Sequence, residues 1–312
     1  MSLRVAAFYR FAAFAADELP RLRTALLHCA ATSGVRGTVL LATEGINGTV
    51  SGPPAGVEEL LSLLRSDPRL AALEVKDSTT TQQPFHRLKV RLKREIVTMG
   101  QPNVAPYLAG PVGTHVPAPQ WDALIHDPTT LVIDTRNSYE VAIGSFTGAI
   151  DPHTTSFGDF PAWVDTHLRP LVETQQPERI ALFCTGGIRC EKATSYLIQQ
   201  GFKGVHHLQG GILSYLEAVP EARSSWQGEC FVFDQRVAVN HQLEPGQHSL
   251  CHACGLPLTP ADRDLPSYLE GVSCLHCLNR FSAADRERFA ERQRQMQLAR
   301  GRGVAHLGPQ PA

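Results

Sequence analysis

The sequence predicts an α/β protein in three parts, and three observations support this fold class. Short apolar runs alternate with helical patterns in the middle of the chain, which indicates a parallel sheet with helices on both faces. Two β-rich runs between helical stretches near the N-terminus indicate a smaller α+β domain. Two CxxC pairs near the C-terminus indicate a small metal-binding segment.

Composition excludes several classes of protein. The 312 residues are 43% hydrophobic, with a net charge of −1, so any nucleic-acid binding must come from a local basic patch. No apolar run approaches the roughly 20 residues that span a bilayer, and Arg10 and Asp17 interrupt the apolar N-terminus, so we expect neither a signal peptide nor a membrane partner. The eight cysteines are too few and too clustered for a disulfide framework, which favours a reducing compartment and a cytoplasmic protein.

Residues 1–100 are predicted to form a ferredoxin-like α+β domain. A turn at Asn47-Gly48 is expected to separate the two β runs of the central hairpin. The expected order β-α-β-β-α-β is that of a split βαβ fold. Its elements are a strand at 5–11, a helix at 17–31, the hairpin within 37–52, a helix at 56–66 and a strand at 88–97.

The rest of the chain divides by composition. Residues 101–120 are rich in Pro and Gly and are interpreted as a linker. Residues 121–222 are expected to form the domain with the parallel sheet, whose strands lie at 131–135, 180–184 and 205–210. Residues 223–284 would then be the cysteine-rich segment, and residues 285–312 a charged helical and flexible tail.

The loop in LFCTGGIRCEKATSYL (182–197) joins a predicted buried strand to a helix N-terminus. Such a position stabilises a thiolate, and it lies at the sheet edge where ligands bind. Gly186 and Gly187 would let the backbone amides form an anion nest, and Arg189 adds a positive charge, so Cys184 is the expected catalytic nucleophile. The remaining loop residues are Thr185 and Ile188. The competing interpretation is a buried cysteine beside a tight turn, and Cys190 is either a second thiol or an ordinary helix residue.

A basic row in HRLKVRLK (86–93) is the candidate RNA-binding surface. On a strand, alternate residues share a face, so the basic side chains would face outward while Leu88, Val90 and Leu92 enter the core. Such a row can follow a phosphate backbone, with stacking surfaces from Phe8, Phe85 and His86, although an ordinary solvated strand face has the same pattern. The row consists of Arg87, Lys89, Arg91 and Lys93, extended by Arg94.

Two further motifs have simple chemical interpretations. ATEGINGT (42–49) is a hairpin with turn-favouring residues. The spacing C-x2-C-x19-C-x2-C is typical of a zinc ribbon, in which four thiolates hold a structural Zn²⁺ and leave no open position for catalysis. Two disulfides are the alternative. The four predicted ligands are Cys251, Cys254, Cys274 and Cys277.

CTGGIRCEKA (184–193) resembles the active-site loop of the rhodanese superfamily, with Cys184 at the catalytic position. The stretches IDTRNSYEVAIGSFTGAI (133–150) and HLQGGILSYLE (207–217) resemble the signatures that flank that loop. The resemblance implies a cysteine persulfide as the usual intermediate. The C-x4-R length is that of sulfur-handling members, whereas related phosphatases have C-x5-R. Asp134 and Arg136 are expected near the same sheet edge as a supporting ion pair.

Most of the chain resembles the tRNA uridine 5-hydroxylase family, whose members carry a rhodanese domain. The resemblance rests on the loop at 184–193 and on LLATEGINGTVSG (40–52), FHRLKVRLKREIVTMG (85–100) and FVFDQRVAV (231–239), in that domain order. It implies formation of 5-hydroxyuridine at the wobble position, with tRNA as partner and O2 as co-substrate. No flavin, haem or nucleotide motif and no iron facial triad stands out, and neither a sulfur donor nor an electron donor is identified.

Three hypotheses of function remain open at this point. In the hydroxylase, the Cys184 thiolate could add to C6 of uridine and make C5 electron-rich; a persulfide or an oxidised cysteine is an equal alternative. The second hypothesis is a sulfurtransferase that carries a persulfide on Cys184. The third is a non-catalytic RNA-binding or redox-sensing protein, in which the basic row matters and Cys184 does not.

Overall fold

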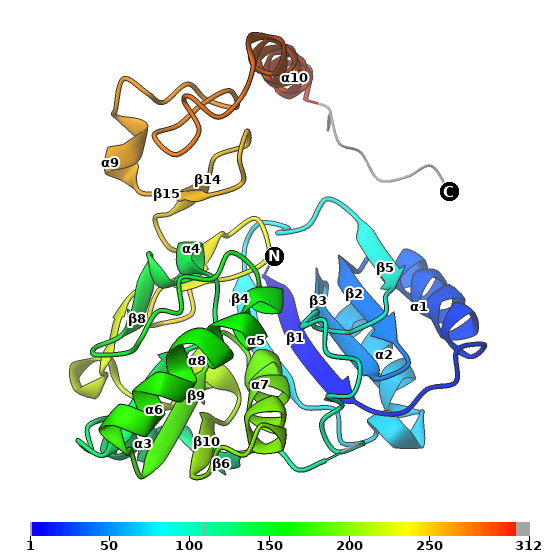
Figure 1. The fold of residues 1–312 in the computed structure, drawn as a ribbon. Coiled ribbons are helices and arrows are strands. Elements are labelled where there is room, and N and C mark those ends of the chain that lie inside the picture. The colour runs from blue at the N-terminus through cyan, green and yellow to red at the C-terminus, as the bar shows by residue number, and fades with distance from the viewer. Residues whose placement is uncertain (1, 109, 304–312) are drawn as a thin grey trace.

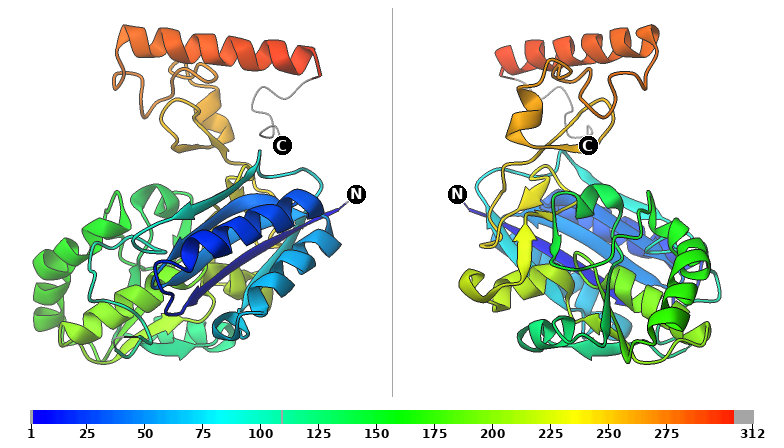
Figure 2. Two further views of the ribbon diagram at one scale, coloured as in Figure 1. Left: turned by 90° about the vertical axis from the view of Figure 1, so that its right-hand side faces the viewer. Right: turned by 60° about the vertical axis from the view of Figure 1, so that its left-hand side comes forward.

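The computed structural model describes residues 2–108 and 110–303, and the chain forms three parts (Figure 1). The N-terminal sheet and the central sheet lie side by side. The C-terminal segment projects from them and carries the last helix (Figure 2). The predicted α/β class is therefore confirmed, with an N-terminal α+β domain and a central parallel sheet.

The N-terminal domain is a five-stranded sheet with two helices on one face (Figure 2). Leu26 of α1 and Leu60 of α2 are fully buried in its core, which shows why the apolar stripes of these helices face the sheet. The strand order is β4-β1-β3-β2-β5, and its first four strands have the ferredoxin-like arrangement. The elements are β1 (Leu3–Phe11), α1 (Leu19–Ser33), β2 (Arg36–Ala42), β3 (Gly45–Gly52), α2 (Pro54–Arg65), η1 (Pro68–Leu70), β4 (Val75–Thr80) and β5 (Leu88–Leu92).

The last strand of the predicted β-α-β-β-α-β order is wrongly placed. The fourth ferredoxin-like strand is β4, which is polar and carries little apolar alternation. The predicted strand at 88–97 is the shorter β5, added in parallel to β2 at the edge of the sheet. Val90 enters the core as expected, but Leu92 is 43% exposed because it ends this edge strand.

The hairpin turn also differs from the prediction. Asn47 and Gly48 lie inside β3, and the chain turns at Thr43-Glu44, because Ala42 pairs with Gly45. Gly45 has φ 149°, and a Cβ there would lie 2.1 Å from the carbonyl oxygen of Arg10. The close approach of β1 therefore explains the first glycine of EGING better than a turn does.

The central domain is built on a four-stranded sheet of order β6-β10-β9-β7, in which every pairing is parallel. Trp121 of α3 and Tyr215 of α8 pack on one face, and Trp163 and Leu197 pack on the other. The elements are β6 (Thr114–Val116), α3 (Ala118–Ile125), β7 (Thr130–Asp134), α4 (Ser138–Val141), β8 (Gly144–Phe146), η2 (Phe157–Asp159), α5 (Phe160–Trp163), η3 (Val164–Leu168), α6 (Arg169–Gln175), β9 (Arg179–Phe183), α7 (Ile188–Gln199), β10 (Val205–Leu208), α8 (Gly211–Ala218) and η4 (Glu221–Arg223).

Both predicted boundaries of the central domain need correction. The strand β6 and the start of α3 fall within the predicted linker 101–120. At the other end, β11 (Trp226–Gly228) pairs with β8, and β12 (Cys230–Phe231) pairs with β13 (Ala238–Val239). Trp226 and Cys230 belong to the core of the central domain, so the start of the predicted segment 223–284 is part of that domain.

The C-terminal segment folds around its cysteines. The short hairpin of β14 (Ser249–Leu250) and β15 (Pro257–Leu258) is followed by α9 (Pro260–Arg263) and by α10 (Ala283–Gly301). The helix of the predicted charged tail packs against the rest of the segment, because Arg292 donates to the carbonyl oxygens of His252 and Gly271 at 2.6 and 3.2 Å. The flexible part of the predicted tail, 304–312, lies outside the described residues. Within 2–108 and 110–303, no helix is both long and apolar enough to cross a bilayer.

Candidate active site

Cys184 lies at the carboxyl end of β9, where the chain turns into α7. Gly187, with φ 100°, is the N-cap of that helix, and its amide donates to the Cys184 Sγ at 3.1 Å. The loop that follows β10 supports the turn, because the amide of Ile212 donates to the Cys184 carbonyl oxygen at 2.9 Å. A Cβ at Gly211 would lie 2.5 Å from the same oxygen, so this contact requires glycine.

The surroundings of Cys184 favour its thiolate. The side chain is fully buried, and burial alone would raise the pKa of the thiol. The hydrogen bond from Cys190, the charge of Arg189, and the amides of Cys190 and Gly187 outweigh that effect and lower the pKa to about 6. At neutral pH, Cys184 is therefore the anion that occupies the amide nest.

Cys190 lies in the first turn of α7 and is also fully buried. Burial and the neighbouring Cys184 raise its pKa well above the usual value of a thiol, so Cys190 keeps its proton. Its sulfur lies 3.7 Å from the hydroxyl of Thr135. The two cysteines thus differ in charge, with Cys190 as the hydrogen-bond donor and Cys184 as the acceptor.

Arg189 does not point freely into the nest. Its guanidinium forms a double salt bridge with the buried carboxylate of Glu140, at 2.7 and 2.8 Å, and donates to Thr185 Oγ1 at 3.2 Å. Burial would raise the pKa of Glu140, but the charge and hydrogen bonds of Arg189, together with the charge of Arg136 and the amide of Asn137, lower it below its usual value. Gly186 and Ile188 line the cavity beside this pair.

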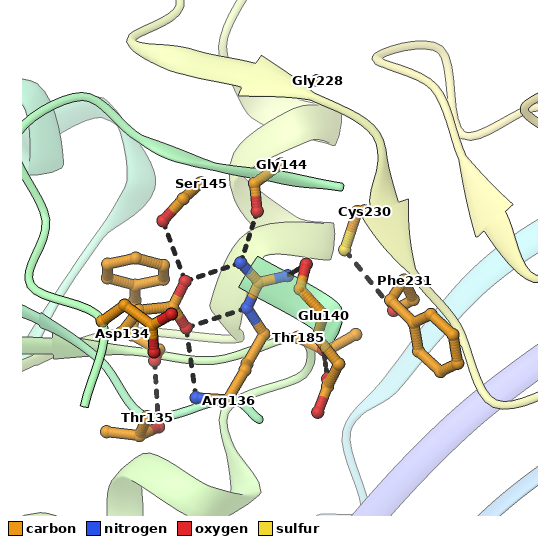
Figure 3. A network of polar contacts seen from close by, with 12 residues as sticks. Asp134, Thr135, Arg136, Glu140, Gly144, Ser145, Thr185, Gly228, Cys230 and Phe231 are labelled. Carbon is orange, nitrogen blue, oxygen red and sulfur yellow. Dashed lines mark hydrogen bonds and ion pairs between the residues drawn. The ribbon is translucent and has the colours of Figure 1, made fainter. Parts of the chain in front are cut away.

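Asp134 and Arg136 form a second buried ion pair, which lies near Glu140 (Figure 3). The Arg136 side chain bonds both carboxylate oxygens of Asp134, at 2.9 and 2.6 Å, and neither side chain is exposed. Arg136 also donates to the carbonyl oxygens of Glu140 and Gly144, and Ser145 donates to Asp134. The pair ties β7 to the loop after α4 and so fixes the helix that carries Glu140.

A third buried charge links the two domains. Lys192 of α7 is fully buried, and its Nζ contacts both oxygens of Glu44 at 3.0 and 2.9 Å and Glu95 at 2.6 Å. Glu44 lies in the hairpin turn of the N-terminal sheet and also accepts the amide of Ile96. ATEGINGT therefore does more than turn the chain, because its glutamate joins the N-terminal sheet to the helix that begins at the Cys184 loop.

A cavity of about 470 Å³ opens above Cys184 between the two domains. Its walls come from the cysteine loop, from the open face of the N-terminal sheet and from the segment 232–236. Phe8 and Phe85, proposed above as stacking surfaces, line it, although both are largely buried. Further lining residues are Tyr9, Asn47, Lys76, Ile96, Phe157 and Phe233.

The predicted basic row lies on the same side of the N-terminal sheet as this cavity. Arg87 and Lys89 line an adjoining hollow of about 690 Å³ together with Phe85 and His86, and Lys93 lines the cavity itself. All five basic residues of the row are exposed, and Arg91 and Arg94 lie outside both linings. Three positive charges of the row therefore border the Cys184 cavity and the hollow beside it.

The four cysteines of the C-terminal segment cluster in a second site. The sulfurs of Cys251 and Cys277 are 3.9 Å apart, those of Cys254 and Cys274 are 3.7 Å apart, and those of Cys274 and Cys277 are 3.6 Å apart. None forms a disulfide, so the alternative of two disulfides is not what the structure shows. The cluster could hold a metal ion.

Comparison with known proteins agrees with this organisation. Residues 3–96 match the model of the UPF0176 acylphosphatase like domain, and residues 118–218 match that of the rhodanese-like domain. A protein of Synechococcus sp. (strain CC9605) named tRNA uridine(34) hydroxylase is 60% identical over 299 residues, which cover 94% of this chain and 91% of that protein. A protein of Agrobacterium fabrum with the same name is 54% identical, over 97% and 94% of the two chains.

The chain belongs to the tRNA uridine(34) hydroxylase family. The resemblance inferred from the motifs is thereby confirmed, and it extends over nearly the whole chain. In this family member, the rhodanese-type loop and the acylphosphatase-like sheet form one cavity between them.

Several residues of this candidate site could not be assigned from sequence. Glu140 is the glutamate of the rhodanese-like stretch 133–150, so its motif was visible but its contact with Arg189 was not. Tyr9, Lys76 and Glu95 come from the other domain and carry no local signal. One clue to the buried ion pairs was visible in the sequence. Three charged residues, Arg189, Glu191 and Lys192, lie close together at the start of α7, and all three are buried.

Proposed function

We propose that this protein hydroxylates C5 of the wobble uridine of tRNA with O2, in the cavity above Cys184. The observation that carries the proposal is a fully buried cysteine with a pKa of about 6 at the end of a cavity large enough for a base. The names of the homologues and the rhodanese-like loop point in the same direction. Because the proposed substrate is tRNA, we propose that the protein is located in the cytoplasm.

Cys184 is proposed to act as a nucleophile toward uracil. Its thiolate forms a bond to C6, and the electron pair of the C5=C6 double bond moves toward C5 and the O4 carbonyl. C5 then becomes the electron-rich carbon that reacts with O2. The amide of Gly187 and the Cys190 thiol hold the thiolate before the attack and after its release. Loss of the C5 proton then restores the C5=C6 double bond and expels the Cys184 thiolate. The net reaction, in which C–H and O2 give C–OH and water, also consumes two protons and two electrons, which an external two-electron reductant supplies.

The cavity would admit a single base flipped out of the anticodon loop. Aromatic side chains at Phe8 and Phe85 offer faces against which a base can stack. The basic row at Arg87, Lys89 and Lys93 would hold the phosphates on either side of that base. Arg91 and Arg94 would extend this contact along the RNA backbone.

We propose Zn²⁺ as the ion of the C-terminal cluster. Zn–S bonds of about 2.3 Å in a tetrahedron place sulfurs about 3.8 Å apart, and the observed separations are 3.6 to 3.9 Å. Four thiolates complete the coordination shell, so this ion would be structural. It would hold the small segment together, since that segment's core consists largely of the cysteines themselves.

The test is mass spectrometry of tRNA nucleosides from a deletion strain complemented with variants. Wild type should restore 5-hydroxyuridine, and Cys184→Ser should not, although its tRNA binding should remain. Cys29→Ser is the matched control, because Cys29 is a buried cysteine in α1 outside the cavity. Normal 5-hydroxyuridine in the Cys184→Ser strain would refute the proposal.

A persulfide carrier is the second candidate, and the same loop favours it. The short C-x4-R loop with an inward amide suits a sulfur anion as well as a free thiolate. The discriminating assay is thiocyanate formation from thiosulfate and cyanide by the purified protein. Two results together would favour this candidate. The protein would form thiocyanate rapidly and only when Cys184 is present, and deletion of its gene would leave the 5-hydroxyuridine content of tRNA unchanged.

A further inference from the structure

Three metal-ligating side chains meet at the sheet edge beside the Cys184 cavity but outside its lining. His115 on β6 and His207 on β10 are direct partners in the parallel pairing of these strands. Glu191 reaches them from the first turn of α7. One ligand atom from each of the three lies within 4.8 Å of the other two.

His207 has a buried ring nitrogen that lacks a partner. The residue is 1% exposed, and its Nε2 forms no hydrogen bond with any residue in the described part of the chain. An unsatisfied buried polar atom of this kind costs about 1–3 kcal/mol. Such an atom in a native protein calls for an explanation, and an ion is one of the explanations to consider.

The hydrogen bonds of Thr194 favour one tautomer of His207. The Thr194 hydroxyl accepts the amide of Gly113 at 3.0 Å and lies 3.2 Å from the carbonyl oxygen of Glu191, to which it can donate its single hydrogen. Its third contact is His207 Nδ1 at 3.3 Å, and with the hydroxyl hydrogen on Glu191 this nitrogen is the donor. In that tautomer Nε2, the nitrogen without a partner, carries the lone pair that a metal ligand requires.

The other two ligands are close to coordination distance. His115 Nε2 lies 3.7 Å from Glu191 Oε1. Metal–ligand bonds of about 2.1 Å place tetrahedral neighbours about 3.4 Å apart, so small rotations of the side chains would close the site. The His115 side chain is 35% exposed, which leaves room for that movement and a path for an ion.

We propose that His115, Glu191 and His207 bind a divalent transition-metal ion. Two imidazoles and one carboxylate suit Zn²⁺, Fe²⁺, Ni²⁺ or Cu²⁺ better than Mg²⁺ or Ca²⁺. Three protein ligands leave coordination positions open, and the Tyr107 hydroxyl, 3.3 Å from His115 Nε2, lies next to this ligand atom. The inference goes beyond the proposed hydroxylation and does not depend on it.

Tyr9 connects this site to the cysteine loop. Its hydroxyl donates to Glu191 Oε1 at 2.8 Å, as an outer-sphere residue that orients a ligand does. The same hydroxyl would lie 2.8 Å from a Cβ at Gly187, and the Tyr9 ring lines the Cys184 cavity. Tyr9 thus contacts the proposed ligand Glu191 and also lines the cavity that contains Cys184. No iron facial triad was visible in the sequence because the three proposed ligands come from three separate elements.

The experiment counts metal ions on the full chain. The protein is stripped with a chelator, reloaded with Zn²⁺, freed of excess metal and measured by inductively coupled plasma mass spectrometry. Wild type should hold one ion more per chain than His115→Ala or Glu191→Gln. His206→Ala is the matched control, because it removes the neighbouring imidazole of β10 that is not part of the cluster, and it should bind as much as wild type.

Two further measurements locate the second ion. In Co²⁺-loaded protein, Cys251→Ser should lose sulfur-to-metal charge-transfer absorption, whereas His115→Ala should lose only weak d–d bands. Added Zn²⁺ or, under anaerobic conditions, Fe²⁺ should raise the unfolding temperature of wild type more than that of the well-folded His115→Ala variant. Equal metal content in wild type, His115→Ala and Glu191→Gln would overturn the inference, and it would do so whether or not the protein hydroxylates tRNA.

Discussion

Cysteines gather at two places in this protein, and the two places hold negative charge by different means. At the loop, one thiolate receives an amide hydrogen bond from Gly187, a hydrogen bond from Cys190 and the field of Arg189. In the C-terminal cluster, four sulfurs lie within 3.9 Å of a neighbour, and no Arg or Lys of the described residues hydrogen-bonds to them.

The two sites have different requirements. A sulfur that must react needs its charge stabilised by the chain itself and needs a cavity beside it. Sulfurs that share one small space repel one another once ionised, so they need a cation from outside. The loop should therefore function without a bound ion, whereas the C-terminal cluster should not stay folded without one.

Metal removal should have the largest effect and should separate the two regions. A structural Zn²⁺ site contributes about 10–16 kcal/mol of apparent binding free energy, so a strong chelator should unfold the C-terminal segment. Hydrogen exchange should then rise steeply in residues 249–281, while residues 179–199 stay protected. If hydrogen exchange of residues 249–281 is unchanged after complete metal removal, the C-terminal cluster does not need a metal ion to stay folded, and the proposed difference between the two sites is wrong.

Glu140→Gln should have the next largest effect, because it leaves Arg189 buried without its counter-ion. Breaking a buried pair in this way costs about 3–5 kcal/mol. The matched control is Glu178→Gln, whose pair with Arg179 is exposed, and which should cost about 1 kcal/mol or less. Chemical denaturation measures both, and equal losses would show that the loop's ion pair is not specially stabilising.

The same pair gives a pH dependence with a definite sign. The pKa of Glu140 is lowered in the folded protein, against the opposing effect of burial. Its contribution to stability is therefore present above the ordinary glutamate pKa of about 4.3 and is lost as pH falls through the lower folded value. The difference in stability between wild type and Glu140→Gln should shrink on acidification, and a difference independent of pH would argue against the ionised pair.

Cys190→Ala should have a moderate effect that is confined to the loop. Loss of a hydrogen bond to a charged group, worth about 1.5–3 kcal/mol, should raise the pKa of Cys184 by about one to two units. The apparent pKa below which the rate of hydroxylation falls should increase by the same amount. Cys230→Ala is the control, because the Cys230 thiol is buried with a pKa raised to about 12 and is not among the groups that shift the pKa of Cys184.

Charge reversal on the basic row should have the smallest effect and should leave both cysteine sites intact. Lys89→Glu and Arg91→Glu should weaken tRNA binding and reduce the salt dependence of log K by about 0.7–0.9 per lost phosphate contact. Lys203→Glu is an exposed control in the other domain. An unchanged salt dependence would show that the row is an ordinary solvated strand face.

Local patterns predicted the parts of the fold that depend on local chemistry. The strand before Cys184, the helix after it and the CxxC spacing each lie within one short stretch, so β9, α7 and the cysteine cluster were expected close to where they occur. The strand β4 was missed because its sequence, VKDSTT, is polar and its stability comes from pairing with β1.

Contacts between distant segments could not be predicted in the same way. Lys192 with Glu44, and Tyr9 with Glu191, join residues of different domains, and no spacing in the sequence encodes such a pair. The turn predicted at Asn47-Gly48 was wrong for a related reason, because the glycine is required by a contact with another strand. The dipeptide usually marks a turn, but here Gly48 serves the packing of β3, because a Cβ would lie 3.0 Å from the ring of Phe8.

The central claim is that Cys184 alone among the loop's thiols is ionised at neutral pH. The direct test is the thiolate absorbance of the metal-loaded protein as a function of pH, taken as the difference between wild type and Cys184→Ser. We expect a transition near pH 6, set by the lowered pKa of Cys184. A transition at or above the ordinary cysteine value of about 8.5 would contradict it.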